Sequence, residues 1–385
     1  MPRKLVVCID GTRNDPTTNT NVYKIKNRIR PHDRLVYYDP GVGTGRIRVG
    51  RQTWIKNVFD RVGGGAFGAG LSGNVQEAYR WICEQYEEGD ELWFFGFSRG
   101  AFTARSTVGF IRNIRLLRPP IDEQILQQAY NLYRKKDGGP DTDEAKEFRR
   151  RENTIVIEHL DIAFVGVWDT VGALGVPGLI LGPVSRRRWG FHDQKLSRYV
   201  RYAYQALGAD ELRAAYLASL WYVQEKDPDD THIYPEQKVE QVWFAGEHSE
   251  IGGAEGEVAL RWMAEKAAAA GLDFDPPVDQ WSAPRQLPLH VGELPSLWWR
   301  FICGRATRAI GDPHYAAQSL SPSLDTAYAD NQDYRRENLV AFKDGKPLED
   351  PIGRRWWFTL PGALRYYLSQ YGNVKKLNVK KSIVK

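Results

Sequence analysis

The fold is decided by residues 91–105, which read ELWFFGFSRGAFTAR. Their first half is dominated by large apolar residues, a composition typical of a strand buried on both faces of a parallel sheet. Ser98 follows between Gly96 and Gly100, and small residues at helical spacing come next. A serine on such a sharp strand-to-helix turn projects its hydroxyl from the carboxyl edge of the sheet. The pattern predicts a nucleophilic serine, although five letters alone also fit a purely structural turn.

Strands and helices alternate on both sides of this turn. We expect strands at 4–9, 35–38, 91–97, 160–168 and, as the last strand, 239–244, with helical patterns at 74–86, 122–152, 194–222 and 258–270. Asn74, with Glu77 three residues later, suits the N-terminal cap of the helix at 74–86. The alternation predicts an α/β fold with a mostly parallel sheet, helices on both faces and helical insertions. We place a catalytic domain at 1–275 and a Trp-rich extension at 276–385, which is either a cap or part of the same domain.

The composition is that of an ordinary globular protein, with 42% hydrophobic and 26% charged residues. A net charge of +5, spread along the chain, gives no reason to expect a nucleic-acid partner. The three cysteines show no disulfide or metal-ligand spacing, which favours buried free thiols. Gly68, Gly70 and Gly73 form a Gly-x-Gly-x-x-Gly without the buried strand that a dinucleotide site needs, and no P-loop lysine follows. We therefore expect no cofactor and no metal.

The sequence contains no run of about 18 apolar residues that could span a membrane. The apolar run at the N-terminus is too short for a secretory signal. We expect a soluble protein made in the cytoplasm, while export by a route without a cleaved signal would leave no trace in the sequence. Nothing in the sequence indicates the oligomeric state.

Three side chains fall just past the ends of three expected strands, namely Ser98, Asp169 and His248. Because the carboxyl ends of parallel strands share one edge of the sheet, these groups can converge there. A serine needs a base to take its proton, histidine is suited to that task, and an acid must orient its ring. The order serine, acid, histidine is that of α/β-hydrolases. Asp169 could instead cap a turn, in which case Glu250 and Asp193 are the alternative acids.

An ester hydrolase also needs two backbone N–H groups as an oxyanion hole. We expect one from Arg99, directly after the serine, and the other from Gly11 or Thr12, after the first strand. Asp10 in the same turn admits a competing interpretation as a phosphotransferase nucleophile of the haloacid-dehalogenase type. That motif requires an acid two residues earlier, where this chain has Cys8, so we discount it.

Five segments taken in order resemble a known family: DGTRN at 10–14, GVGT at 41–44, GFSRGAFTAR at 96–105, WDTVG at 168–172 and WFAGEHSEIGG at 243–253. They look like the uncharacterised α/β-hydrolase-domain family that includes the first class of type VI secretion lipase effectors. The resemblance covers roughly residues 4–275. It implies an α/β-hydrolase fold, a Ser98–Asp169–His248 triad, and phospholipase activity in the effector members. The chain departs from the family pattern at Arg13, where a bulky aromatic is frequent, and at Glu250, where aspartate is usual.

These patterns predict a serine ester hydrolase acting on lipid, a phospholipase that works through an acyl-Ser98 intermediate. The lipid expectation rests on the resemblance, on an apolar loop at 176–184 beside three arginines at 186–188, and on the tryptophans of the C-terminal third. An exposed apolar loop would give peripheral membrane contact. Two alternatives stay open: a soluble carboxylesterase or thioesterase for small acyl substrates, and a non-enzymatic scaffold that uses the aromatic region to bind a partner.

Overall fold

A computed structural model describes most of the first 172 residues and parts of the rest of the chain. The described residues are 2–11, 14, 16–30, 34–41, 66–135, 139–151, 156–157, 160–172, 196–213, 216–222, 237–286, 288–289, 306–346 and 348.

The centre of the molecule is a sheet whose seven described strands all run parallel. In spatial order they are β2 (Arg34–Asp39), β1 (Lys4–Ile9), β3 (Glu91–Phe97), β6 (Asp161–Trp168), β7 (Val200–Gly208), β8 (Lys238–Phe244) and β9 (Gln318–Leu320). The chain goes from β1 to β2 on one side and then places β3 on the other side of β1. Ligands of open α/β sheets bind beyond the carboxyl ends of the strands at such a reversal. The topology therefore singles out the ends of β1 and β3.

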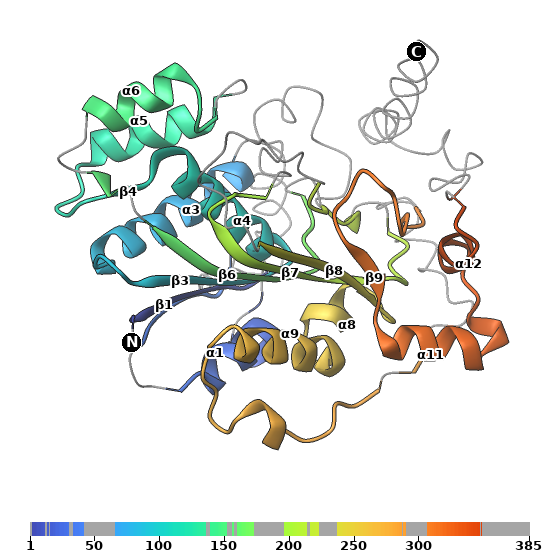
Figure 1. The fold of residues 1–385 in the computed structure, drawn as a ribbon. Helices are drawn as coiled ribbons and strands as arrows, with labels where there is room; N and C mark the ends of the chain where they lie inside the picture. The colour runs from blue at the N-terminus through green and yellow to red at the C-terminus, as the bar shows by residue number, and fades with distance from the viewer. Residues whose placement is uncertain are drawn as a thin grey trace, which may run out of the picture.

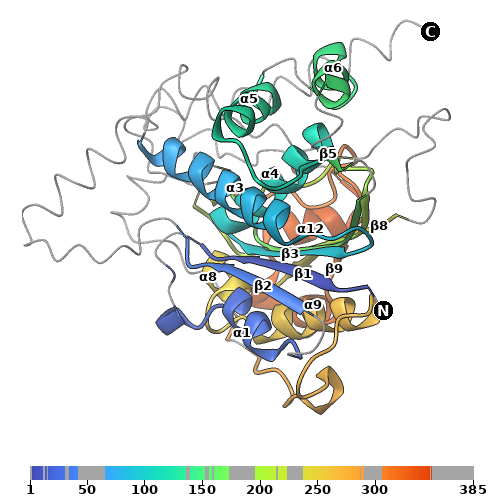
Figure 2. The same ribbon diagram turned by 90° about the vertical axis from the view of Figure 1, so that its left-hand side faces the viewer.

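Helices cover both faces of this sheet (Figure 1, Figure 2). One face carries α3 (Ala66–Gln85) and α4 (Arg99–Ile114), with α5 (Glu123–Tyr133), α6 (Asp143–Arg151) and the ribbon β4 (Leu116–Leu117)–β5 (Val156–Ile157) outside them. The other face carries α1 (Asn21–Arg28), α8 (His248–Gly252) and α9 (Glu257–Ala269). Beyond β8 lie α11 (Pro322–Asp330) and α12 (Glu337–Lys343), and 3-10 turns occur at Pro16–Thr18, Val278–Gln280 and Gln332–Tyr334. The layers confirm the predicted α/β-hydrolase-like fold with helical insertions.

The apolar run of β3 is continuous because both of its faces are covered. Phe94 is buried in the cluster under α3 and α4, whereas Trp93 and Phe95 belong to the cluster under α1 and α9. Trp93 stacks on Phe164 of β6 with ring centroids 5.2 Å apart. Each buried aromatic of this size contributes roughly 1.5–3 kcal/mol by leaving water. The strand is thus fixed from both sides, and the turn at its end with it.

The junction between β3 and α4 is unusually tight. A Cβ on Gly96 would lie 2.7 Å from the Cα of Ala101, and one on Gly100 would lie 2.2 Å from the carbonyl oxygen of Ile9 in β1. Between them the backbone of Ser98 adopts φ 57° and ψ −120°, a conformation that residues other than glycine rarely adopt. Gly100 is needed because the first turn of α4 passes directly against the backbone of β1, and Gly96 is needed because the same turn passes directly against β3.

Most predicted elements are present, and three expectations are wrong. Residues 200–208 form strand β7, not a helix, and the polar Gln205 that interrupts its apolar pattern is buried and hydrogen-bonded to Ser219. β8 is not the last strand, since the three residues of β9 pair with it and are too few to show a period. Asn74 does not cap a helix, because α3 begins at Ala66 and the Asn74 side chain donates a hydrogen bond to Asp39.

The described part of the C-terminal region packs on the sheet. A fully buried cluster around Trp243 of β8 contains Leu324 of α11, Leu339 of α12 and Tyr334 of the 3-10 turn between these helices. The domain boundary at 275 stays a prediction. The tryptophan pairs at 298–299 and 356–357, like the apolar loop at 176–184 and the arginines at 186–188, lie outside the described residues.

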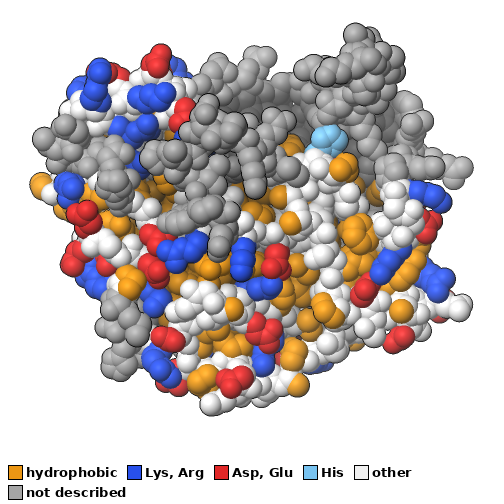
Figure 3. Space-filling model, viewed as in Figure 1, with side chains coloured by type: hydrophobic (Ala, Val, Ile, Leu, Met, Phe, Trp, Pro, Cys, Tyr) orange, Lys and Arg blue, Asp and Glu red, His pale blue; other side chains and the backbone are white. Residues whose placement is uncertain are grey.

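Charges of both signs are interspersed over the described part of the face shown in Figure 3, in keeping with the small net charge. Cys8 and Cys83 are buried free thiols, as predicted, and Cys303 lies outside the described residues. Within the described ranges, every helix is too short or too polar to cross a bilayer.

The tight junction gives a first prediction. Gly100→Ala should destabilise the protein by about 1–3 kcal/mol, because the new methyl group meets backbone that cannot move aside. Gly73→Ala is the matched control: Gly73 lies inside α3, and no atom of the described residues lies within 4 Å of an added Cβ. Helix propensity should stabilise this variant by about 0.5–1 kcal/mol. Urea unfolding followed by circular dichroism measures both. Equal stability of the two variants would contradict the packing argument.

Candidate active site

Three buried side chains from different strands meet at the carboxyl edge of the sheet. Ser98 follows β3, Asp169 follows β6, and His248 begins α8 after β8. The His248 Nε2 atom lies 2.8 Å from the Ser98 Oγ atom, and its Nδ1 atom lies 2.5 Å from the Asp169 Oδ2 atom. The structure thus brings together the three residues that the sequence placed after separate strands. Their geometry is that of a nucleophile, a base and an acid that orients the base.

The imidazole ring of His248 lies between two aromatic rings. Phe97 stacks on it with centroids 4.9 Å apart and an interplanar angle of 29°, and Tyr216 approaches at 4.9 Å with an angle of 55°. The backbone N–H of His248 donates to the carboxylate of Glu211 at 3.3 Å. Packing on two sides limits rotation of the ring, so both of its nitrogen atoms stay directed at their partners.

Asp169 is fully buried, and each of its oxygen atoms has two partners. Oδ1 accepts from the Gly208 N–H at 3.0 Å and from Arg308 at 2.5 Å. Oδ2 faces His248 and accepts from Arg308 at 2.8 Å. Burial by itself would raise the pKa of Asp169, but the Arg308 guanidinium and the hydrogen bond with His248 hold that pKa well below its ordinary value. The carboxylate is therefore ionised at neutral pH.

Two of the expected oxyanion donors, Arg99 and Gly11, lie next to Ser98. Arg99 is the first residue of α4, and the N–H groups at a helix N-terminus lack partners within the helix. Gly11 packs beside the serine, since a Cβ added to it would lie 3.3 Å from the Ser98 Cβ. The Gly11 N–H, however, donates to the Asp10 carboxylate at 3.0 Å, and Thr12 lies outside the described residues. The oxyanion role of Arg99, Gly11 and Thr12 stays a prediction.

Asp10 itself is buried and has four hydrogen-bond partners, one of which is the side chain of Asn14. Besides Gly11, the hydroxyl of Thr20 donates to it at 2.6 Å and that of Tyr38 at 3.0 Å. Burial raises the pKa of its carboxyl despite these donors. A carboxylate held in this way braces the turn after β1, and the competing phosphotransferase interpretation gains no support.

Of the two alternative acids, the one that the structure describes is engaged elsewhere. The side chain of Glu250 accepts the Glu247 N–H at 2.7 Å and so caps α8. Asp193 lies outside the described residues, as do five of the other six histidines. The sixth, His314, is exposed and pairs with Asp312 at 2.7 Å.

Sequence reasoning missed Arg308. It lies in an irregular segment of the C-terminal region, 2% exposed, and reaches Asp169 with both terminal nitrogen atoms. No motif or period distinguishes it from the other 52 of the chain's 53 basic residues. Only the tertiary contact reveals it.

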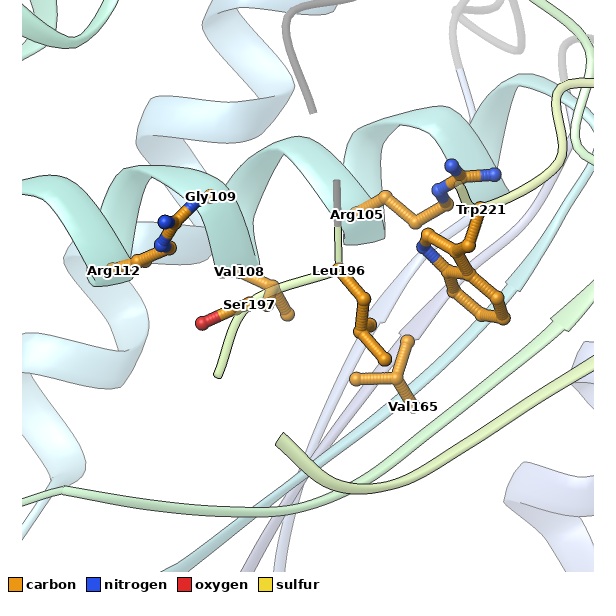
Figure 4. Close-up of a pocket in the computed structure, with 8 residues that line it drawn as sticks. All are labelled: Arg105, Val108, Gly109, Arg112, Val165, Leu196, Ser197 and Trp221. Carbon is orange, nitrogen blue, oxygen red and sulfur yellow. The ribbon is translucent and has the colours of Figure 1, made fainter. Parts of the chain in front are cut away.

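A small pocket lies apart from these residues, along the later turns of α4 (Figure 4). At one end Arg105 lies over the ring of Trp221, with 4.7 Å between the guanidinium carbon and the ring centroid. Arg105 also donates to the carbonyl of Ser219 at 2.5 Å. The pocket therefore belongs to the packing that holds residues 219–221, and neither Ser98, Asp169 nor His248 lines it.

Comparison with known families identifies the architecture. The model of the type VI secretion system (T6SS) Tle1-like phospholipase effector catalytic domain matches residues 3–266. The chain belongs to this family. The match confirms the resemblance seen in the sequence and supports a hydrolase of the lipase and esterase class. It contains Ser98, Asp169 and His248, whereas Arg308 lies beyond its end.

Individual relatives are more distant. An uncharacterised protein of Saccharomyces cerevisiae, YEL023C, is 29% identical over 204 residues, which are 48% of this chain and 29% of that protein. The chain thus covers less than a third of this curated relative. A solved structure of the Tle1 effector bound to the VgrG spike is 14% identical over 66% of this chain and 51% of its own, with a TM-score of 0.33. Esterase 2 of Thermogutta terrifontis is 13% identical over 71% and 85% of the two chains, with a TM-score of 0.34. At such scores these structures say nothing about the reaction.

The low pKa of Asp169 predicts a specific acid sensitivity. An unfolded aspartate has a pKa near 3.9, so below about pH 4 the unfolded chain takes up a proton that folded Asp169 resists, and stability falls as the pH falls. Asp169→Asn should lack this component while being less stable at neutral pH, because Arg308 then loses its charged partner. The control Asp141→Asn removes an exposed ion pair with Arg198 and should keep the wild-type slope. Urea unfolding from pH 3 to 7 measures all three, and equal slopes for wild type and Asp169→Asn would refute the assignment.

Proposed function

We propose that the chain is a serine hydrolase that cleaves an acyl ester of a phospholipid through an acyl-Ser98 intermediate. The observation that carries the proposal is the continuous relay from the Ser98 hydroxyl through the two His248 nitrogen atoms to the ionised Asp169. A hydroxyl, a base and an orienting acid in contact are what acyl transfer needs. The family match supports the same reaction class.

In the first half-reaction the Ser98 oxygen attacks the ester carbonyl while His248 Nε2 takes the hydroxyl proton. Asp169 holds the imidazolium and keeps Nδ1 protonated. The oxyanion that forms is expected at the N-terminus of α4, with Arg99 as one backbone donor and Gly11 or Thr12 as the second donor predicted from the sequence, each contributing about 10²–10³ in rate. Collapse breaks the ester C–O bond, and the proton passes from His248 to the leaving alcohol.

In the second half-reaction His248 takes a proton from water, whose oxygen attacks the acyl-Ser98 carbonyl. The bond from the carbonyl carbon to the serine oxygen breaks, the fatty acid is released, and the proton returns to Ser98. The strained turn supports both halves because it holds Oγ clear of the backbone.

A lipid substrate is the more specific part of the proposal. It rests on the family match and on the sequence of the C-terminal third, which is rich in tryptophan, a residue suited to the membrane–water interface. The apolar loop at 176–184 next to three arginines fits peripheral contact with an anionic membrane surface. Small acyl esters or thioesters are the alternative substrates, and a scaffold that binds a partner is the non-enzymatic alternative.

Replacing the nucleophile tests the mechanism. Ser98→Ala should lower hydrolysis by at least about 10³-fold and leave stability nearly unchanged, because it removes no charge and only one oxygen atom. Ser106→Ala, a buried serine two turns further along α4, is the matched control and should stay active. A fluorophosphonate probe followed by mass spectrometry should label wild type at Ser98 only. Folded wild-type protein that takes no label would favour the scaffold.

The substrate class needs its own measurement. Release of fatty acid from anionic phospholipid vesicles should exceed hydrolysis of matched short-chain esters in kcat/KM, since binding energy from the acyl chain is available only with the lipid. The Ser98→Ala protein serves as the blank in both assays. Activity confined to the short esters would overturn the phospholipid proposal while leaving the serine mechanism intact.

A further inference from the structure

A buried guanidinium lies on the far side of the proposed catalytic acid. Arg308 is 2% exposed and Asp169 is 0% exposed. The two terminal nitrogen atoms of Arg308 donate to the two oxygen atoms of Asp169 at 2.5 and 2.8 Å. This parallel pair of bonds fixes the plane of the carboxylate, which a point charge could not do.

Arg308 is also tied to the backbone on both sides of the acid. It donates to the carbonyl of Gly208 at the end of β7 at 2.8 Å and to the carbonyl of Tyr216 at 2.5 Å. The Tyr216 ring is one of the two that enclose His248. The Arg308 side chain thus contacts Asp169, the end of β7, and the residue whose ring packs on His248.

The segment that delivers Arg308 is anchored in the fold. The Ala306 N–H donates to the Leu212 carbonyl at 2.9 Å, and β9 pairs with β8 a few residues later. The Ser321 N–H then donates to the Trp243 carbonyl at 2.8 Å. Burying two ions is costly, and the Nε atom of Arg308 adds to that cost because it has no hydrogen-bond partner among the described residues. Packing alone does not account for such a pair.

We propose that Arg308 is the positioning residue of the site: its fork fixes the carboxylate of Asp169 in the orientation that directs His248 toward Ser98. The proposal rests on the proposed serine mechanism. It adds to the site a residue that lies beyond residue 266, where the family match ends. The catalytic unit then requires the C-terminal segment that carries β9, because this segment supplies the partner of the acid.

The charge of Arg308 has a second consequence, for the pH dependence of the rate. Arg308 and His248 face Asp169, and Glu211, which is paired with Arg213, lies close to both Arg308 and His248. Removing the Arg308 charge takes away the cation that stabilises the Asp169 carboxylate and so raises the pKa of Asp169. Less of the site then carries the ionised carboxylate at acidic pH. The acidic limb of kcat/KM should therefore move to higher pH.

The experiment compares Arg308→Met, Arg308→Lys and Arg336→Met in the full chain. Arg336 is the matched control, an arginine of the same C-terminal region whose Nε lies 2.9 Å from Asp210. Arg308→Met should lose about 10–10²-fold in kcat through misplacement of the histidine, and its acidic limb should rise by about one pH unit or more. Arg308→Lys keeps the positive charge but lacks the two parallel N–H donors. Its kcat should therefore fall, while the acidic limb of its kcat/KM profile should stay at the wild-type pH. Arg336→Met should keep the wild-type kcat and the wild-type pH profile of kcat/KM, even if its stability changes.

Rescue separates positioning from folding. Millimolar guanidinium should restore part of the activity of Arg308→Ala and none to Ser98→Ala. A wild-type rate and pH profile in folded Arg308→Met would overturn the proposal. If Arg308→Met does not fold, a wild-type rate in Arg308→Lys would overturn it instead. Activity surviving in Ser98→Ala would refute the serine mechanism itself, an outcome distinct from a failure at Arg308 alone.

Discussion

The passage of α4 across the end of β1 is the constraint on which the site depends. Gly100 leaves no side chain between the helix and the Ile9 carbonyl, and Gly96 leaves none between the strand and Ala101. Ser98 between them is held at a positive φ, a strain of order 1–3 kcal/mol that the surrounding packing must offset. Burial of β3 on both faces supplies that packing. The strained serine exists because the strand before it cannot move.

Around this turn the structure buries ionised groups in pairs. Asp169, paired with Arg308, contacts the Nδ1 atom of His248, and Glu211, paired with Arg213, accepts the backbone N–H of His248. Each acid is 0–1% exposed. Such pairs add little net stability, since the gain from attraction is offset by the loss of hydration. They do fix charge at defined positions in a region that excludes water, where electrostatic orientation is strongest. The arrangement favours a site held rigid before substrate arrives.

The predictability of each element followed from the range of the interactions that form it. Ser98, Asp169 and His248 could be found because each follows a strand whose apolar run is visible in the sequence. The sequence predicts helix where β7 lies because Gln205 interrupts the strand pattern, and only a buried partner, the Ser219 carbonyl, makes a glutamine acceptable there. Asn74 was mistaken for a cap because the glycines before it resemble a loop, whereas the structure continues α3 through them.

The sequence by itself determined the parallel α/β architecture, the sharp serine turn and the three residues that meet at the strand ends, because these depend on short-range patterns of apolar residues and glycines. Tertiary structure alone decided that Arg308 holds Asp169 and that Tyr216 and Phe97 enclose His248. Arg308 and Asp169 are 139 residues apart. A contact between groups so distant in the chain exists only once the sheet has brought both segments to one edge, and no local pattern records it.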